Sequence, residues 1–121
     1  MSPSKISALV YYGKELAGRL SRQQLADGSE SFEFEYLPNY LARADAMPIS
    51  LSMPLRKEIF SSKTLFPFFD GLLPEGWLLD LTTKALKIDK QDKFSLLLHT
   101  GPDTIGAVTV HPETTDLEKD T

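Results

Sequence analysis

The segment at residues 65–80 constrains the fold most, because it concentrates apolar residues and interrupts them with two prolines and two glycines. It is rich in Phe and Leu and holds the only Trp of the chain. The residues that interrupt it are Pro67, Gly71, Pro74 and Gly76. Proline fits the first turn of a helix and glycine its end. We therefore predict a short helix over residues 65–70, capped by Thr64 and ended by Gly71, and a longer helix that starts at Pro74.

Trp77 follows the turn-like sequence Pro74-Glu75-Gly76 in this segment. Trp is enriched where one protein surface contacts another, because its rigid side chain buries a large area and carries an N–H donor. Buried aromatic side chains are also common in cores. The residues alone therefore leave two interpretations of Trp77 open: a core residue, or a residue that contacts a partner.

The first half of the chain has the composition and spacing of β-strands. Residues 6–12 are rich in branched and aromatic side chains, and Gly13-Lys14 supplies a turn into residues 15–20, which predicts a hairpin. In residues 32–36 aromatic side chains alternate with Glu, the pattern of a half-buried antiparallel strand. Residues 49–53 lie between two prolines, and we predict a short extended segment there, at a sheet edge.

The end of the chain adds a third helix and a last strand. Asp89 is predicted to cap that helix, which carries its apolar side chains at Phe94, Leu97 and Leu98. Residues 105–110 are predicted as the final strand. This order indicates a small single α+β domain. Its mostly antiparallel sheet, an N-terminal hairpin plus further strands, would pack with two or three helices from the second half.

Charge and composition limit the classes of function. We divide the chain into a domain at residues 1–110 and an acidic tail at residues 111–121, which we expect to be flexible. The net charge of −4 argues against direct nucleic-acid binding. The chain has no Cys, which fits a reducing cytoplasm, and no apolar run near the roughly 20 residues that span a bilayer. We expect a cytoplasmic protein that does not bind membranes.

Catalytic groups are not evident in the sequence. It has no glycine-rich cradle for phosphates, and His99 and His111 are too far apart to form a helical metal pair. Glu75 and Asp80 could flank a cleft as an acid–base pair, but a favourable charge at a helix N-terminus and a solvated helix face explain them more simply. We predict that the protein is not an enzyme and uses no cofactor or metal.

Several blocks of the sequence match one family in order. The segment DGLLPEG at residues 70–76 resembles the NLLPEG signature in the N-terminal region of HipA-family toxin kinases. Residues 47–55, MPISLSMPL, are similar to the PISLSMPL segment of that family, and residues 32–36 to its F-x-Y strand. Residues 92–98 and 101–108 resemble its LL…G-x-D-x-x-GAV ending. The resemblance covers nearly the whole chain.

The resemblance implies a function in binding. In HipA-family kinases this region is a small domain ahead of the catalytic body, and in tripartite HipBST systems it is a separate antitoxin, HipS. The chain would then bind and inhibit a HipT-like kinase toxin, in a larger complex with a HipB-like DNA-binding protein. The partner-binding residues implied are Pro74, Glu75, Gly76 and Trp77. Two alternatives stay open: a structural subunit that completes a split kinase and supports its activity, and a fragment of a full-length toxin.

Overall fold

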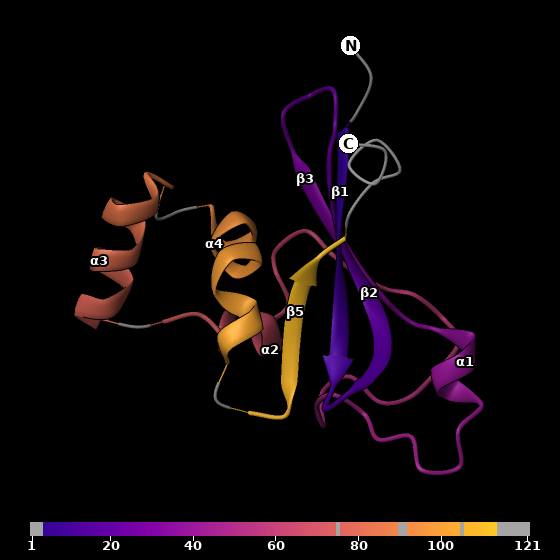
Figure 1. Ribbon diagram of the computed structural model, residues 1–121. Helices are drawn as coiled ribbons and strands as arrows, with labels where there is room; N and C mark the ends of the chain where they lie inside the picture. The colour runs from indigo at the N-terminus through magenta and orange to yellow at the C-terminus, as the bar shows by residue number, and fades with distance from the viewer. Residues whose placement is uncertain (1–3, 75, 90–91, 105, 114–121) are drawn as a thin grey trace, which may run out of the picture.

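A five-stranded antiparallel sheet forms the centre of the protein (Figure 1). The structure is a computed structural model that describes residues 4–74, 76–89, 92–104 and 106–113. The strand order is β4-β3-β2-β1-β5, and all neighbours are antiparallel. The strands are β1 (Ser4–Tyr12), β2 (Glu15–Gln24), β3 (Glu30–Tyr36), β4 (Phe60–Ser62) and β5 (Val108–Pro112). The predicted α+β class and antiparallel sheet are confirmed.

Glycines allow the first three strands to turn and to approach closely. Gly13 adopts a φ of 61° in the β1–β2 turn, a left-handed conformation that glycine enters without strain. A Cβ on Gly18 of β2 would lie 2.4 Å from the backbone oxygen of Glu35 and 2.6 Å from the ring of Phe34. Only glycine therefore lets β3 pack this closely on β2. The predicted hairpin and the alternating third strand are both present.

Aromatic side chains fill the core on one face of the sheet. Phe34 is fully buried on β3, and its ring centroid lies 5.7 Å from that of Phe69. Tyr36 packs edge-on against Phe34, with the ring centroids 4.9 Å apart. Such tilted and edge-to-face contacts are the favourable geometries for aromatic pairs. The alternation in β3 therefore directs its aromatic residues inward and leaves Glu33 and Glu35 on the other face.

The described helices are α1 (Pro38–Leu41), α2 (Pro67–Asp70), α3 (Gly76–Leu86) and α4 (Lys93–Thr100), followed by the 3-10 turn η1 (Gly101–Asp103). Of these, α2 and α4 pack against this face of the sheet (Figure 1). Phe69 of α2 and Phe94 of α4 reach into the core. In Figure 1, α4 lies beside β5, whereas α3 lies beyond α4, away from the sheet. No described helix is long and apolar enough to cross a membrane.

Two helices begin later than predicted. Helix α2 starts at Pro67, and its N-cap is Phe66, which is extended and makes no side-chain capping bond. A proline disfavours the helical conformation of the residue before it, so α2 begins after Phe66. Thr64 is therefore not the cap of α2. Helix α3 starts at Gly76 rather than at Pro74.

The cap of α4 also differs from the prediction. Asp92, not Asp89, is the N-cap, and its carboxylate accepts a hydrogen bond from the backbone N–H of Ser95 at 3.2 Å. The backbone oxygen of Asp89 accepts from the N–H of Asp92 at 2.9 Å. Asp89 therefore belongs to the turn that leads into the helix.

The predicted edge segment at residues 49–53 is not a strand of the sheet. It forms a tight turn with a single antiparallel bridge between Ser50 and Met53. The hydroxyl of Tyr36 bonds the backbone of this segment, so its polar groups are satisfied without a neighbouring strand. The edge strand is instead β4, which pairs with β3. The short helix α1, with Pro38 at its first turn, was also not predicted.

The last strand is displaced along the sequence. β5 begins at Val108 rather than at residue 105, which lies outside the described residues, and continues to Pro112. The next residue, Glu113, accepts hydrogen bonds from Nε and Nη2 of Arg19, both at 3.0 Å. The domain boundary drawn at residue 110 therefore falls inside β5. Residues 114–121 of the predicted tail lie outside the described residues.

Candidate partner-binding surface

Three of the four predicted partner-binding residues, Pro74, Gly76 and the backbone of Trp77, lie where the core leads into α3. Just before them, Leu73 is buried in the core with 8% of its surface exposed. Pro74 is half-buried, and Gly76 is the first residue of α3. Glu75 lies outside the described residues, as do the side chain of Trp77 and the predicted acid–base pair of Glu75 with Asp80. Both interpretations of Trp77 thus stay predictions, but its backbone position, in the first turn of α3, is fixed.

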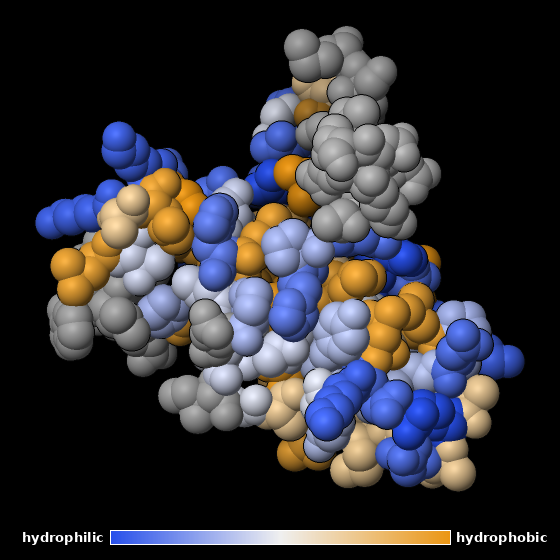
Figure 2. All heavy atoms as spheres, in the orientation of Figure 1, coloured by the Kyte–Doolittle hydropathy of each residue, from blue (hydrophilic) through white to orange (hydrophobic). Residues whose placement is uncertain are grey.

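Helix α3 exposes apolar side chains to solvent. Leu81 is 54% exposed and Leu86 is 39% exposed. In Figure 2 hydrophobic side chains are visible at the surface over α3, beside hydrophilic ones. Residues 77, 81 and 85 follow one another at intervals of one helical turn, so they share one face of α3. This face begins at the position of Trp77.

Contacts with the core are made at the two ends of α3. At its start, Leu73 is buried. At its end, Lys87 has a φ of 57°, and the N–H groups of Lys87 and Ile88 bond the carbonyls of Lys84 and Thr83 at 3.4 and 3.1 Å. This is a Schellman ending with Lys in the position that glycine usually takes. Ile88 then packs against the core. The flanking residues thus fix the helix while Leu81 stays in solvent.

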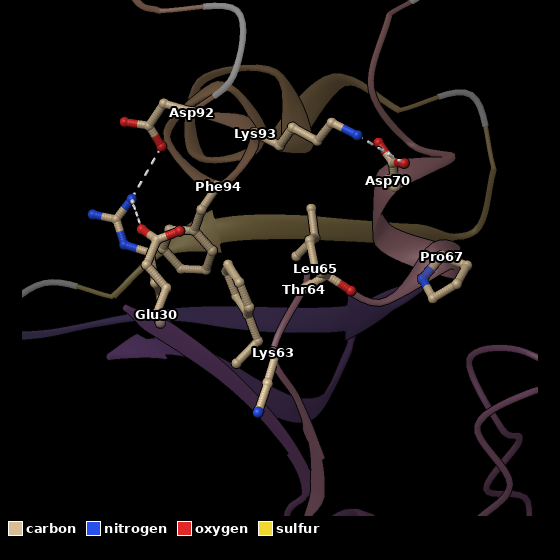
Figure 3. Close-up of a pocket in the computed structure, with 11 residues that line it drawn as sticks. Glu30, Lys63, Thr64, Leu65, Pro67, Asp70, Asp92, Lys93 and Phe94 are labelled. Atoms are coloured by element: carbon tan, nitrogen blue, oxygen red, sulfur yellow. Dashed lines mark hydrogen bonds and ion pairs between the residues drawn. The ribbon is translucent and has the colours of Figure 1, made fainter. Parts of the chain in front are cut away.

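A polar pocket of about 440 Å³ lies on the other side of α4, between that helix, α2 and the start of β3 (Figure 3). Arg22 of β2, only 8% exposed, is its most buried charge. Nη1 of Arg22 lies 3.0 Å from Oδ1 of Asp92 and 3.8 Å from Oε2 of Glu30. Its guanidinium lies 5.3 Å from the centre of the Phe94 ring. On the far rim, Lys93 forms an ion pair with Asp70 of α2.

One carboxylate of this pocket links the sheet to α4. Asp92 bonds Arg22 and at the same time caps α4, so one carboxylate joins the sheet to the helix. The pocket carries cations and anions together, which does not favour a ligand of either sign. Sequence reasoning missed this cluster. The sequence held one signal for it. Arg22 lies two residues after Leu20 and therefore on the same, inward-facing side of the strand, and a charge on a buried face needs a charged partner.

The two histidines occupy separate places in the fold. Nδ1 of His99 lies 3.0 Å from the backbone oxygen of Ser95, one turn earlier in α4. His111 is on β5, where its ring meets Tyr11 edge-on at 5.2 Å. Over the part of the chain that the structure describes, His, Asp and Glu side chains form no group of three that could hold a metal ion.

Comparisons with known proteins give the family. A family model described as "HipA N-terminal domain" matches residues 7–111. A solved structure titled "N-terminal domain of HipA toxin" superposes with a TM-score of 0.64 at 35% identity, covering 91% of this chain and 94% of that one.

Two curated relatives show this domain in different settings. An "Uncharacterized protein" of Haemophilus influenzae is 39% identical over 89 residues, which make up 74% of this chain and 80% of that protein. "Putative kinase Y4mE" of Sinorhizobium fredii is 36% identical over 96 residues, which make up 79% of this chain but only 23% of that protein. The domain therefore forms most of one relative and less than a quarter of the other. The chain belongs to the HipA N-terminal domain family.

Proposed function

We propose that this chain is an antitoxin that binds and inhibits a HipA-like Ser/Thr kinase, as HipS does with HipT. The observation that carries the proposal is the exposure of apolar side chains on α3. Within a domain of this family, the segment after Leu-Leu-Pro-Glu-Gly is a helix with exposed leucines, attached to the core at both ends. Exposed apolar side chains on a fixed element favour binding to another protein.

Inhibition of this kind requires binding and no chemistry. A protein that binds one conformation of a kinase better than another shifts the kinase toward that conformation, and one that occupies the substrate approach blocks it. Trp77 is the candidate for the largest share of the binding energy, because Trp dominates protein interfaces and has little side-chain entropy to lose. Pro74 and Gly76 set the path of the chain just before it.

We further propose that the protein is not an enzyme and requires no cofactor. Its sequence lacks the phosphate cradle and the Mg²⁺ ligands that phosphoryl transfer needs. It would act in the cytoplasm, in a complex that also holds a HipB-like DNA-binding protein. Its own net charge of −4 disfavours direct contact with nucleic acid. Purified protein with Mg²⁺ and ATP should therefore release no phosphate; turnover abolished by a substitution in this chain would contradict this.

The second candidate is a structural subunit that completes the fold of a split kinase and supports its activity. The Sinorhizobium relative favours it, because there the matching region lies in one longer chain whose name describes a kinase. Both candidates predict a complex with a kinase. They differ in the sign of the effect on its activity.

Co-expression with the HipA-like kinase of the same genome separates the two candidates. For an antitoxin, the kinase alone arrests growth, and this chain restores it. For a structural subunit, the kinase alone is harmless and becomes toxic only when this chain is present. If the two purified proteins do not form a complex, both candidates are wrong.

A further inference from the structure

A second group of exposed apolar side chains lies in the loop between α1 and β4, residues 42–59. Leu51 is 99% exposed at the tip of the Ser50–Met53 turn. Met47 is 51% exposed, and Ile59 is 47% exposed. Single exposed apolar residues are ordinary on protein surfaces. Several in one loop, including a fully exposed leucine at a turn, are not.

Two tyrosine hydroxyls hold this loop in place. The hydroxyl of Tyr40 donates to the backbone oxygen of Met47 at 2.6 Å and accepts from its N–H at 3.0 Å. The hydroxyl of Tyr36 accepts from the N–H of Ile49 at 3.0 Å and donates to the oxygen of Met53. Burial raises the pKa of the Tyr36 hydroxyl still further above neutral pH, where a tyrosine is already protonated and able to donate. The turn that carries the exposed leucine is therefore fixed on both sides.

The two rings are themselves part of the core. Tyr36 and Tyr40 are each 3% exposed and stack with an angle of 11° between their planes, 6.1 Å apart. The turn is thus bonded to core side chains rather than to other loops. A rigid turn loses little conformational entropy when it binds, which is the condition for an efficient binding residue.

Arg56 holds the second half of the same loop. Its guanidinium lies 3.6 Å from the centre of the Phe60 ring, and its Nε donates to the backbone oxygen of Glu58 at 3.2 Å. Lys57, beside it, is exposed. The part of the loop after the turn therefore adds two cations, Arg56 and Lys57, and one acid, Glu58, to the apolar tip, and over residues 42–59 three cations stand against two acids. A complementary surface would have an apolar pocket bordered by carboxylates.

We propose that the 42–59 loop is a second, preformed contact surface for the kinase, with Leu51 entering an apolar pocket bordered by carboxylates. The proposal rests on the proposed function and extends it to a surface separate from α3, which lies at the opposite side of the molecule in Figure 1. The Sinorhizobium relative supports this occupant, because its matching region belongs to a chain about four times as long, against which exposed apolar surface can pack. Two separate contacts on one partner would raise the affinity beyond that of either.

The direct test is the affinity of Leu51→Ser for the kinase of the same genome, measured with purified proteins. We expect the affinity to fall about thirtyfold, the effect of losing a central interface residue. The melting temperature should stay that of the wild type, because Leu51 has almost no contacts to lose. Leu25→Ser is the matched control: this leucine is 39% exposed in a turn at the opposite end of the sheet, and its change should leave the affinity unaltered.

Tyr40→Phe tests whether the rigid turn matters. It should weaken kinase binding in the wild-type background and have no further effect in a Leu51→Ser background, because both changes remove the same contact. An unchanged affinity of Leu51→Ser, with Trp77→Ala weakened, would overturn the loop proposal and leave the proposed function intact. A wild-type protein that does not bind the kinase would overturn both.

Discussion

Helices α3 and α4 come from the same half of the chain and face different surroundings. Leu96 and Leu97 of α4 are fully buried, whereas Leu81 of α3 is 54% exposed. The start of α4 is fixed by the Asp92 cap and its bond to Arg22. The sequences of both helices predict amphipathic helices. Only α4 has the sheet to cover, so its apolar residues stabilise the fold, whereas Leu81 of α3 stays in solvent, where the proposed partner could contact it.

The largest expected effect is on the buried side of this comparison. Leu97→Ala removes a fully buried side chain and leaves a cavity, which costs about 2–5 kcal/mol of unfolding free energy. That is a large part of the stability of a domain of this size. Urea unfolding followed by circular dichroism measures it. A loss below about 1 kcal/mol would mean that α4 is not the stabilising helix.

The cap of α4 should have an intermediate effect. Asp92→Ala removes both the capping acceptor and the carboxylate that faces the buried Arg22, and we expect a loss of about 1–3 kcal/mol. Asp92→Asn keeps a good cap but not the ion pair, so it should lose less. The same urea titration compares them. If Asp92→Asn and Asp92→Ala lose the same unfolding free energy, the cap contributes nothing and the bond to Arg22 accounts for the whole effect.

The smallest expected effect on stability is on α3. Leu81→Ala is the matched change to Leu97→Ala, and it should alter the unfolding free energy by no more than about 0.5 kcal/mol. Kinase inhibition should nevertheless weaken, since Leu81 lies one turn after Trp77. A melting temperature lowered as far as that of Leu97→Ala would show that α3 belongs to the core, and the comparison would fail.

Local patterns predicted much of the fold. The alternation at residues 32–36 and the Gly13-Lys14 turn gave three strands and their hairpin, because each signal acts within a few residues. Helix starts were less accurate. Helix α2 begins later than predicted because Pro67 restricts the conformation of Phe66. Helix α4 is capped by Asp92 rather than Asp89, and Asp92 also bonds Arg22, which lies seventy residues away in the sequence.

The candidate surface was only partly predictable. The family motif located the segment at Pro74–Trp77, but sequence spacing could not tell that α3 lies beyond α4. Within the loop at residues 42–59, residues 49–53 were predicted as a short extended segment at a sheet edge because two prolines bracket an apolar run. Its actual shape depends on Tyr36 and Tyr40, whose hydroxyls bond its backbone from a distance that sequence patterns do not report.

The most direct test of the account measures Trp77→Ala for thermal stability and kinase inhibition side by side. We predict a melting temperature close to that of the wild type and inhibition weakened at least about thirtyfold, as for the loss of a residue central to an interface. A core residue would behave differently, since truncating a buried Trp costs about 3–5 kcal/mol and could unfold the domain. A collapsed melting temperature, or inhibition as strong as that of the wild type, would contradict the claim that α3 and the segment before it bind the kinase.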